Sequence, residues 1–433
     1  MPIPTRRLAA VCVIASIAMI GVASWAGFLA VNAVLLVVAL VDRLLAPSPD
    51  VVRVERLLPE VISLDVPGEV HWLITNPTTR ALSIDIADEL APSLRARTRR
   101  VRVRVPAGRT AEARTRFRPA RRGRFRIDEL VVRVEGPLGL AAVQKARHRA
   151  DTMRVFPPFK SRDEAELRIN RARLLELGLR TAQGRGGGTE FDQLREYSPD
   201  DEFKRIDWPA TARLGKPIVR TYRAERNQVV INLLDNGRVM AARVDDVPKV
   251  EHAMDAVMML TAVSCGLGDR AGLVAFDSEV RSIVSPGAGR AQLGRVTEAM
   301  YALEPQLVES DYLGAFTQTL ARFRRRAMLV LYTDLVEQAV RETLLPALPL
   351  IAKSHIVLIA SVQDPAIVRW ARSSPTTEEE VYRKAAAVLA LDERTRTKAV
   401  LRGLGATVVD APPGKLASQL ADAYLRVKAT GRL

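Results

Sequence analysis

The feature that most constrains this chain is a run of 34 residues without a charged side chain, Leu8–Val41. Asn32 is its only strongly polar side chain. As one helix the run would extend about 51 Å, too long for a single crossing of a bilayer core about 30 Å thick. The sequence therefore predicts two membrane helices, Leu8–Ala23 and Gly27–Val41, joined by a turn at Ser24–Gly27.

The charges around this run predict its orientation. Arg6 and Arg7 precede it and Arg43 follows it. Positive residues favour the cytoplasmic side, so residues 1–46 are expected to form a two-pass anchor in the cell membrane with the soluble domains in the cytoplasm. The alternatives are a cleaved signal peptide and a hairpin buried in a protein core.

Residues 51–157 change to a period of two, which is typical of half-buried strands. Turn signals such as Pro67-Gly68 and Pro106-Ala-Gly108 separate the alternating segments. Several short strands at this spacing predict an Ig-like β-sandwich. The expected strands begin at Val51, Val70, Leu82, Val101, Ala113 and Leu130.

The sandwich region is rich in arginine. Between Arg95 and Arg126 there are fourteen arginines against Glu112 alone. Because this domain directly follows the anchor, the cluster is expected to contact anionic lipid headgroups. The alternatives are an ordinary solvated face and the general arginine bias of a chain whose formal charge is +16. Nucleic acid is not an expected partner, because few aromatic side chains accompany the arginines.

Residues 158–185 are expected to form a helical connector whose apolar face packs on a neighbouring domain. A glycine-rich stretch follows, but no GxxxxGK[ST] motif occurs and no predicted strand leads into it. Nucleotide binding is therefore not expected there.

Residues 186–226 carry the densest mixture of charges and aromatic rings in the chain. Such a segment buries its rings only if its charges pair or stay at the rim. We expect mutual ion pairs among Glu190, Arg195, Glu196, Arg205, Asp207 and Arg213. The alternative is an enzyme of unknown reaction that uses the carboxylates of Glu196, Asp200, Asp201 and Asp207. The residues that define this signature segment are Gly188, Glu190, Phe191, Leu194, Arg195, Glu196, Tyr197, Asp200, Asp201, Arg205, Asp207, Trp208, Arg213, Arg220, Tyr222 and Glu225.

The spacing of these residues, G-T-E-F-x-x-L-R-E-Y-x-x-x-D, then R-I-D-W-x-x-x-A-R and K-P-x-V-R-x-Y-x-x-E, resembles the bacterial domain-of-unknown-function family 58. The resemblance implies a membrane-anchored protein whose signature segment precedes a von Willebrand factor type A-like domain. It also implies an association with MoxR-type AAA+ ATPases, beside which such proteins are often encoded.

Residues 227–433 alternate between continuous apolar strands, including Val229–Leu234 and Met328–Tyr332, and helices, including Val336–Ile351, which predicts a parallel-rich, doubly wound α/β domain. Ligands of such sheets bind at the carboxyl ends of the strands, where Asp235 and Asp334 are expected. In the von Willebrand factor type A-like family an aspartate of this kind helps to hold a divalent cation. Here Gly237 and Val239 occupy the family's serine positions, and Ser310 and Asp311 lie near its threonine position.

Asp235 and Asp334 are therefore candidates for a degenerate site that weakly binds Mg²⁺ or Mn²⁺. The alternative is that they cap the helices that follow. No other cofactor is expected, and no catalytic residue is assigned, because the four histidines show no HExxH spacing and Cys265 lies in an apolar helical pattern. The leading hypothesis is a membrane-anchored, non-enzymatic protein-interaction module that works with a MoxR-type AAA+ ATPase in the assembly or maturation of protein complexes. The alternatives are a metal-dependent adhesion-like binder and the enzyme above.

Overall fold

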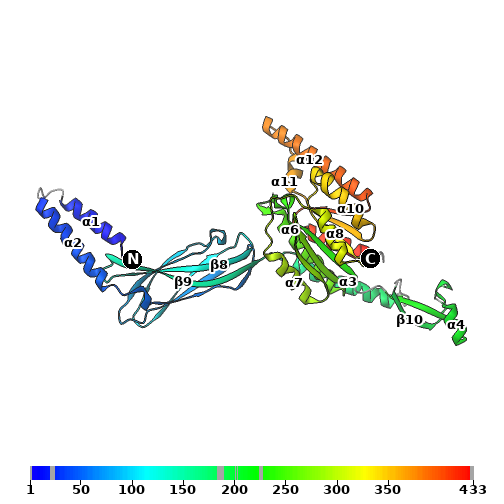
Figure 1. The fold of residues 1–433 in the computed structure, drawn as a ribbon, viewed down its shortest axis with the longest axis horizontal. Helices are drawn as coiled ribbons and strands as arrows, with labels where there is room; N and C mark the ends of the chain where they lie inside the picture. Colours follow the sequence, from blue (N-terminus) through cyan, green and yellow to red (C-terminus); the bar gives the residue numbers. More distant parts are fainter. Residues whose placement is uncertain are drawn as a thin grey trace. The chain divides into compact units, whose positions relative to one another are not determined.

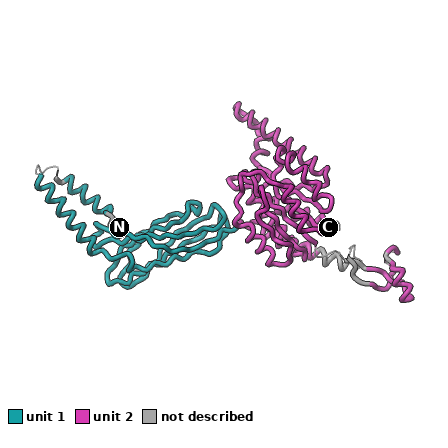
Figure 2. The backbone as a smooth tube through the Cα atoms, in the orientation of Figure 1, with its two compact units in different colours: residues 1–156 teal, residues 157–433 magenta. Residues whose placement is uncertain are grey.

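A computed structural model of the chain describes residues 2–19, 25–182, 190–199, 201, 203–223 and 228–429. The chain divides into two compact units, Met1–Phe156 and Pro157–Leu433 (Figure 2). The sequence placed the end of the sandwich at residue 157, next to this division.

The first unit begins with a short strand, β1 (Pro2–Pro4), and two apolar helices, α1 (Arg6–Met19) and α2 (Trp25–Leu45). Among the described residues, one segment, Trp25–Val51, is long and apolar enough to cross a membrane. The predicted turn at residues 24–27 is wrong at residues 25–27, because α2 already begins at Trp25, and Ser24 lies outside the described residues. An unbroken apolar sequence gives no local signal for where such a helix starts.

Two sheets form a sandwich after the helices. One sheet has the order β1-β9-β8-β5-β6, with β3 added beside β9, and the other has the order β2-β4-β7. Buried side chains from both sheets, including Trp72, Ile84 and Val132, form one core between them. The strands are β2 (Arg53–Leu57), β3 (Val61–Ser63), β4 (Gly68–Thr75), β5 (Leu82–Asp88), β6 (Arg100–Val105), β7 (Thr110–Phe117), β8 (Gly123–Glu135) and β9 (Ala141–Phe156).

A buried ion pair crosses this core. Arg56 Nη2 lies 2.6 Å from Asp88 Oδ1, and both side chains are fully enclosed. Asp88 also accepts a hydrogen bond of 2.7 Å from Trp72 Nε1. Because a buried charge is costly unless it is paired, these contacts fix β2, β4 and β5 against one another.

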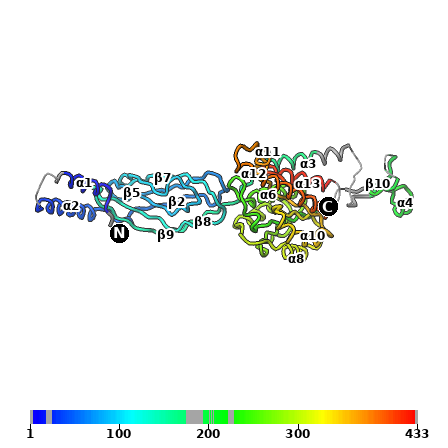
Figure 3. Tube along the Cα trace, turned by 90° about the horizontal axis from the view of Figure 1, so that it is seen from above, coloured from blue at the N-terminus to red at the C-terminus, as the bar shows by residue number. Residues whose placement is uncertain are grey.

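The apolar helices are fastened to the sandwich through Asp42, which is fully buried near the end of α2. Its carboxylate accepts hydrogen bonds from the backbone N–H groups of Leu138 at 2.7 Å, Leu140 at 2.7 Å and Ala141 at 2.8 Å. These residues lie at the β8–β9 turn, so α2 is held at that end of the sandwich (Figures 1 and 3).

The second unit contains a six-stranded sheet of order β16-β15-β12-β17-β18-β19. All neighbours pair in parallel except β15 and β16, which pair antiparallel at one edge. The strands are β12 (Val229–Asp235), β15 (Arg270–Phe276), β16 (Val280–Gly287), β17 (Met328–Tyr332), β18 (Ile356–Val362) and β19 (Thr407–Ala411).

Helices cover both faces of this sheet (Figure 1). Val230 and Leu234 of β12 pack in one apolar core with α3, α6, α7 and α13, while Ile231 and Leu233 pack in another with α8, α10 and α12. This alternation within one strand is what a doubly wound sheet requires. The helices are α3 (Arg162–Ala182), α5 (Arg238–Ala241), α6 (Lys249–Gly266), α7 (Arg290–Tyr301), α8 (Tyr312–Arg322), α10 (Leu345–Ala352), α11 (Pro365–Arg372), α12 (Glu378–Gly403) and α13 (Leu416–Ala429). A two-stranded ribbon, β13 (Arg243–Val244) and β14 (Val247–Pro248), precedes α6.

The helix expected from Val336 to Ile351 is present over residues 337–352, but it is irregular, because α9 (Glu337–Ala339), a π-helical turn (Val340–Leu344) and α10 follow one another. Pro346 and Pro349 explain the irregularity, because proline lacks the N–H that a regular helix uses. The sequence also missed α11, which Asp364 caps by accepting a hydrogen bond from Ala366 N.

The signature segment forms a separate antiparallel hairpin of β10 (Glu190–Glu196) and β11 (Ile218–Arg223). Between the two strands lie a 3-10 turn, Phe203–Arg205, and a short helix, α4 (Trp208–Leu214). Asp207 caps α4 by accepting a hydrogen bond from Ala210 N, and Gly215 ends it in the left-handed region with φ 67°.

Candidate functional site

The carboxyl edge of the parallel strands is the candidate site. β12 ends at Asp235, and β17 ends at Tyr332, immediately before Thr333 and Asp334. These strands are neighbours in the sheet, so their following loops lie together at one edge. The sequence predicted this placement of the two aspartates, but not the side chains that surround them.

Asp235 is fully buried and serves as a hydrogen-bond acceptor for several loops. Its Oδ1 accepts from Ser310 Oγ at 2.5 Å and from Gly237 N at 2.9 Å. Its Oδ2 accepts from Tyr312 Oη at 2.8 Å and from Thr333 Oγ1 at 2.6 Å. Burial raises the pKa of Asp235, and the hydroxyl donors lower it in part. The side chain thus ties together the segments after β12, before α8 and after β17.

Gly237 explains how Ser310 reaches Asp235. A Cβ atom placed on Gly237 would collide with Ser310 Oγ. The space that a serine side chain would need at position 237 is therefore filled by the hydroxyl of Ser310, which comes from a distant segment. Glycine at position 237 therefore leaves the room in which the Ser310 hydroxyl reaches Asp235.

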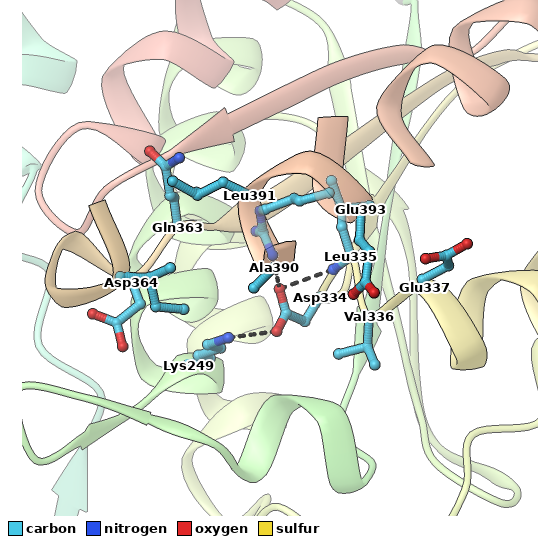
Figure 4. Close-up of a pocket in the computed structure, with 12 residues that line it drawn as sticks. Lys249, Asp334, Leu335, Val336, Glu337, Gln363, Asp364, Ala390, Leu391 and Glu393 are labelled. Atoms are coloured by element: carbon cyan, nitrogen blue, oxygen red, sulfur yellow. Dashed lines mark hydrogen bonds and ion pairs between the residues drawn. The ribbon is translucent and has the colours of Figure 1, made fainter. Parts of the chain in front are cut away.

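Asp334 is 4% exposed and lies between two cations (Figure 4). Lys249 Nζ donates to its Oδ2, and Arg394 Nη1 donates to its Oδ1 at 2.8 Å. Ser361 Oγ and Leu335 N also donate to Oδ1, at 3.2 Å and 2.8 Å. Burial by itself would raise the pKa of Asp334, but Arg394 and Lys249 together lower it. The carboxylate is therefore held as an anion.

This charge network extends into α12 and β19. Arg394 Nη2 lies 2.7 Å from Asp410 Oδ1, and Lys398 Nζ lies 3.0 Å from Asp410 Oδ2. Together the network contains three cations, Lys249, Arg394 and Lys398, and two carboxylates, Asp334 and Asp410. It joins α6, β17, α12 and β19 around the carboxyl edge.

Two cavities of about 200 Å³ and 310 Å³ adjoin at this edge and share Asp334 and Val336 in their walls. In the first, Ala390 and Leu391 of α12 face Lys249 and Asp334 (Figure 4). The second is lined on its apolar side by Val239, Ala242, Val308, Val336 and Ala339. Both therefore have apolar walls, and Asp334, which they share, already has Lys249 and Arg394 as partners.

The described residues do not fit a divalent cation at this edge. Lys249 and Arg394 bind the oxygens of Asp334, and four donors bind the oxygens of Asp235. A metal ion would have to displace these donors and lie beside two positive groups. Within the described ranges, no group of three or more His, Cys, Asp or Glu side chains is placed to hold a metal.

The alternative that the two aspartates cap helices is also wrong. The N-cap residue of α5 is Gly237 and that of α9 is Val336, in both cases without a side-chain cap bond. Asp235 and Asp334 instead accept bonds from Gly237 N and Leu335 N within their own loops. Their main partners come from other segments, because tertiary contacts bring better donors to the edge.

The predicted ion pairs of the signature segment are only partly correct. Arg195 Nη2 lies 2.5 Å from Asp201, Lys216 Nζ lies 3.0 Å from Glu196, and Arg220 Nε lies 2.6 Å from Asp207. The expected mutual pairing among Arg195, Glu196, Asp207 and Arg213 is wrong, since Arg213 Nε donates to Pro209 O at 3.2 Å. Each described carboxylate is thus paired with its own cation, which does not support a converging acidic centre.

Gly188, Asp200 and Glu225 lie outside the described residues, as do the side chains of Glu190, Phe191, Arg205 and Tyr222. Leu194, Phe203 and Trp208 are exposed, and the rings of Phe203 and Trp208 meet edge to face at 5.6 Å. The backbone N–H of Ala210 and the guanidinium of Arg220 lower the pKa of Asp207.

Sequence reasoning missed most of the residues around the two aspartates. Tyr312, Lys249, Arg394 and Asp410 were not identified, and Ser310 was noted only for its position in the chain. Arg394 lies in the middle of a helix with many charges, so its pattern resembles a solvated position. Its burial follows from where α12 packs, which periodicity alone does not reveal.

Comparison with protein families matches part of this chain to a family model. The family described as "Protein of unknown function DUF58" matches residues 193–370, which run from β10 into α11. This agrees with the resemblance drawn from the signature segment. An uncharacterised protein of Mycobacterium tuberculosis is 27% identical over 244 residues, covering 52% of this chain and 74% of its own length. An uncharacterised protein of Mycobacterium bovis matches to the same extent.

Comparison with solved structures gives low similarity over the whole chain. The conserved hypothetical protein BatB of Bacteroides thetaiotaomicron covers 47% of this chain and 99% of its own, with a TM-score of 0.28 and 13% identity. The CARDB domain of a Pyrococcus furiosus protein covers 24% of this chain and 86% of its own, with a TM-score of 0.17 and 10% identity.

Proposed function

We propose that this chain is a membrane-anchored, non-enzymatic protein-interaction module. The apolar segment Trp25–Val51 supports an anchor. We infer that α1 crosses the membrane beside α2, so that both ends of the pair and the soluble units lie in the cytoplasm. Arg6, Arg7 and Arg43 at the two ends of the pair favour this orientation.

The docking surface of the module is the carboxyl edge of the α/β sheet. We assign this unit to the von Willebrand factor type A-like class, on the basis of its doubly wound sheet with one antiparallel edge strand. The observation that carries the proposal is the pair of adjoining, apolar-walled cavities around Asp334. Concave surfaces of this kind, at this edge, are where α/β sheets bind their ligands.

The arrangement supports binding rather than catalysis. A general base must reach a substrate proton with a free lone pair. The oxygens of Asp235 and Asp334 are instead occupied by donors from the protein. The same contacts disfavour a metal-dependent mode of binding at this edge, so the docking surface works without a resident cation.

The partner proposed from the family resemblance is a MoxR-type AAA+ ATPase, and the process is the assembly or maturation of protein complexes. The test uses the intact chain, purified from membranes in detergent, and a purified MoxR-type ATPase from the same organism. Ala339→Trp and Ala390→Trp place a large side chain in the two cavities without removing a charge. Ser354→Trp is the matched control, because exposed Ser354 precedes β18 at the opposite edge of the sheet.

The expected result is that the ATPase binds the unaltered chain and the Ser354→Trp variant, and that each cavity variant binds it at least about tenfold more weakly. Equal binding by all variants would remove the carboxyl edge as the docking surface. No binding to the unaltered chain would refute this partner.

A further inference from the structure

One turn of the sandwich holds both ends of the apolar helix pair. The turn comprises residues 136–139, between β8 and β9, and is closed by a hydrogen bond of 2.9 Å from Gly139 N to Gly136 O. At the end of α2, Asp42 packs so closely on Gly136 that a Cβ atom placed on this glycine would lie 2.5 Å from the Asp42 carboxyl group. At the start of α1, Thr5 Oγ1 donates to Gly139 O at 2.6 Å. The start of α1 and the end of α2 therefore lie together at this turn (Figure 1).

Three arginines lie at this junction, and we define Arg6, Arg7 and Arg43 as the junction arginines. Arg6 and Arg7 occupy the first turn of α1, and Arg43 directly follows Asp42 in α2. The guanidinium group of Arg7 packs on the turn, because a Cβ atom placed on Gly139 would lie 2.8 Å from Arg7 Nη1. Arg6 and Arg7 are exposed, and Arg43 is half-buried. The fold thus brings together cations that are far apart in the sequence.

The described carboxylates at this end of the sandwich do not neutralise the junction arginines. Asp42 is occupied by three backbone N–H groups of the turn. Glu135 is paired with Arg102 at 2.6 Å, and Asp50 is paired with Lys145 at 2.7 Å. Within the described residues, none of the three junction arginines forms an ion pair with a carboxylate. The junction therefore presents positive charge to its surroundings.

The start of α1 makes this charge more costly. The N–H groups at a helix N-terminus carry partial positive charge, so an anion there is stabilising and a cation is not. The first turn of α1 contains Arg6 and Arg7 and no acidic residue. An anion from outside the chain that lay beside these two arginines would offset both the helix dipole and the guanidinium charges.

The position of the junction identifies the source of that anion. The junction arginines bound the uncharged run Leu8–Val41, so in the anchor proposed above they lie where the apolar segment meets water. The turn lies at the same level, because it contacts Arg7 and Asp42, and its Leu138 is 55% exposed. Phosphate groups of lipids occupy this level of a bilayer, and the cytoplasmic leaflet carries the anionic ones.

We propose that the junction arginines and the turn at residues 136–139 form a docking site for the headgroup of an anionic phospholipid. Guanidinium groups form paired hydrogen bonds with phosphate oxygens. Leu138 contacts the acyl chains beside that headgroup. This site requires the membrane anchor proposed above and is separate from the docking edge of the α/β sheet.

The site lies at the end of the sandwich that the chain does not leave from. β9 begins beside the turn at Ala141 and ends at Phe156, about 50 Å away along the strand. Lipid contact by the arginine-rich stretch Arg95–Arg126 stays a prediction from the sequence. Three exposed arginines of that stretch provide the matched control.

The test measures lipid binding to the full chain purified in detergent. The probes are short-chain phosphatidylglycerol and short-chain phosphatidylcholine, and native mass spectrometry gives the Kd of each. The glutamine variant, Arg6→Gln/Arg7→Gln/Arg43→Gln, removes the junction charges. The lysine variant, Arg6→Lys/Arg7→Lys/Arg43→Lys, keeps these charges and the orientation that they favour in the membrane.

The matched control, Arg97→Gln/Arg99→Gln/Arg100→Gln, removes the same charge from exposed positions elsewhere on the sandwich. The unaltered chain is expected to bind phosphatidylglycerol at least about tenfold more tightly than phosphatidylcholine. The glutamine variant should lose this preference. The lysine variant and the control should keep it within about threefold.

Equal losses in the glutamine variant and the control would show a response to net charge alone and overturn the proposal. Displacement of the lipid by an equal concentration of inorganic phosphate would also overturn it, because the arginines would then bind a free anion. Washing membranes with alkaline carbonate tests the anchor separately. Release of the unaltered chain would refute the anchor and this site with it, whereas a retained chain without a lipid preference would overturn this site alone.

Discussion

The contact between Lys249 and Asp334 offers a direct test of how the carboxyl edge is stabilised. Replacing Asp334 with alanine leaves the buried ammonium of Lys249 without its carboxylate partner, while Arg394 keeps Asp410 at 2.7 Å. Removing one member of a buried ion pair costs about 3–5 kcal/mol, because the remaining charge is uncompensated. The Asp334→Ala variant should therefore lose about that much stability in the second unit.

The double variant Lys249→Met/Asp334→Leu tests the origin of this loss. It removes both charges and keeps the apolar volume, so it should recover most of the stability that Asp334→Ala loses. Asp364→Ala is a control at the rim of the same cavity. It removes a carboxylate that caps α11, and it should cost only about 1 kcal/mol.

Thermal and urea unfolding of the purified chain, with and without Mg²⁺, provide the measurement. For a domain of this size a loss of 3–5 kcal/mol corresponds to a decrease in Tm of about 6–20 °C. The unaltered chain and the Asp334→Ala variant should show the same Tm with and without the ion. A Mg²⁺-dependent rise in Tm that Asp334→Ala abolishes would refute the charge-network interpretation, as would a double variant no more stable than the single one.

Three further predictions concern other contacts. Asp42→Ala leaves three backbone N–H groups of the β8–β9 turn without their acceptor, and each unsatisfied group should destabilise the attachment of α2 by about 1–3 kcal/mol. Amide hydrogen exchange at residues 138, 140 and 141 should therefore become faster. Unchanged exchange at these residues would contradict the proposed attachment of α2. Arg56→Ala leaves Asp88 buried without its cation and should destabilise the sandwich by about 3–5 kcal/mol. The loss is measured by urea unfolding, followed by the fluorescence of Trp72 in a chain whose other tryptophans are replaced. Arg53→Ala, at an exposed position of the same strand, is the control. Burial lowers the pKa of His355, whose Nδ1 accepts a hydrogen bond of 3.2 Å from Ala327 N. Because the folded-state pKa is lowered, His355 contributes stability above its unfolded pKa of about 6.5, and this stability is lost as the pH falls through the folded-state pKa. The Tm should therefore decrease below about pH 6.5. His355→Gln should make that decrease smaller.

Local patterns were enough to predict most strands and helices. β12 was expected at Val229–Leu234 and occupies Val229–Asp235, and β17 was expected and found at Met328–Tyr332. A buried parallel strand is a short continuous apolar run, so its position can be predicted from the sequence alone. β9 (Ala141–Phe156) was missed because much of it alternates polar with charged residues.

The signature segment shows where a charge pattern stops being informative. The sequence predicted that its carboxylates and cations pair, and Asp201, Glu196 and Asp207 do so. Which cation each one takes depends on the β10–β11 register, in which Glu196 lies opposite Ile218 and Leu194 opposite Arg220. The sequence allows many different pairings of these carboxylates with the nearby cations, and only the register of the two strands selects among them.

The sequence by itself determined the apolar N-terminal segment, the alternating sandwich, the doubly wound sheet and the position of Asp235 and Asp334 at its carboxyl edge. Only the tertiary structure decided what those aspartates contact: Ser310 in the space that Gly237 leaves open, and Lys249 and Arg394 on either side of Asp334. The physical reason is that hydrophobic periodicity acts over a few residues, whereas a buried carboxylate takes its partners from whichever segments the fold brings within hydrogen-bond distance.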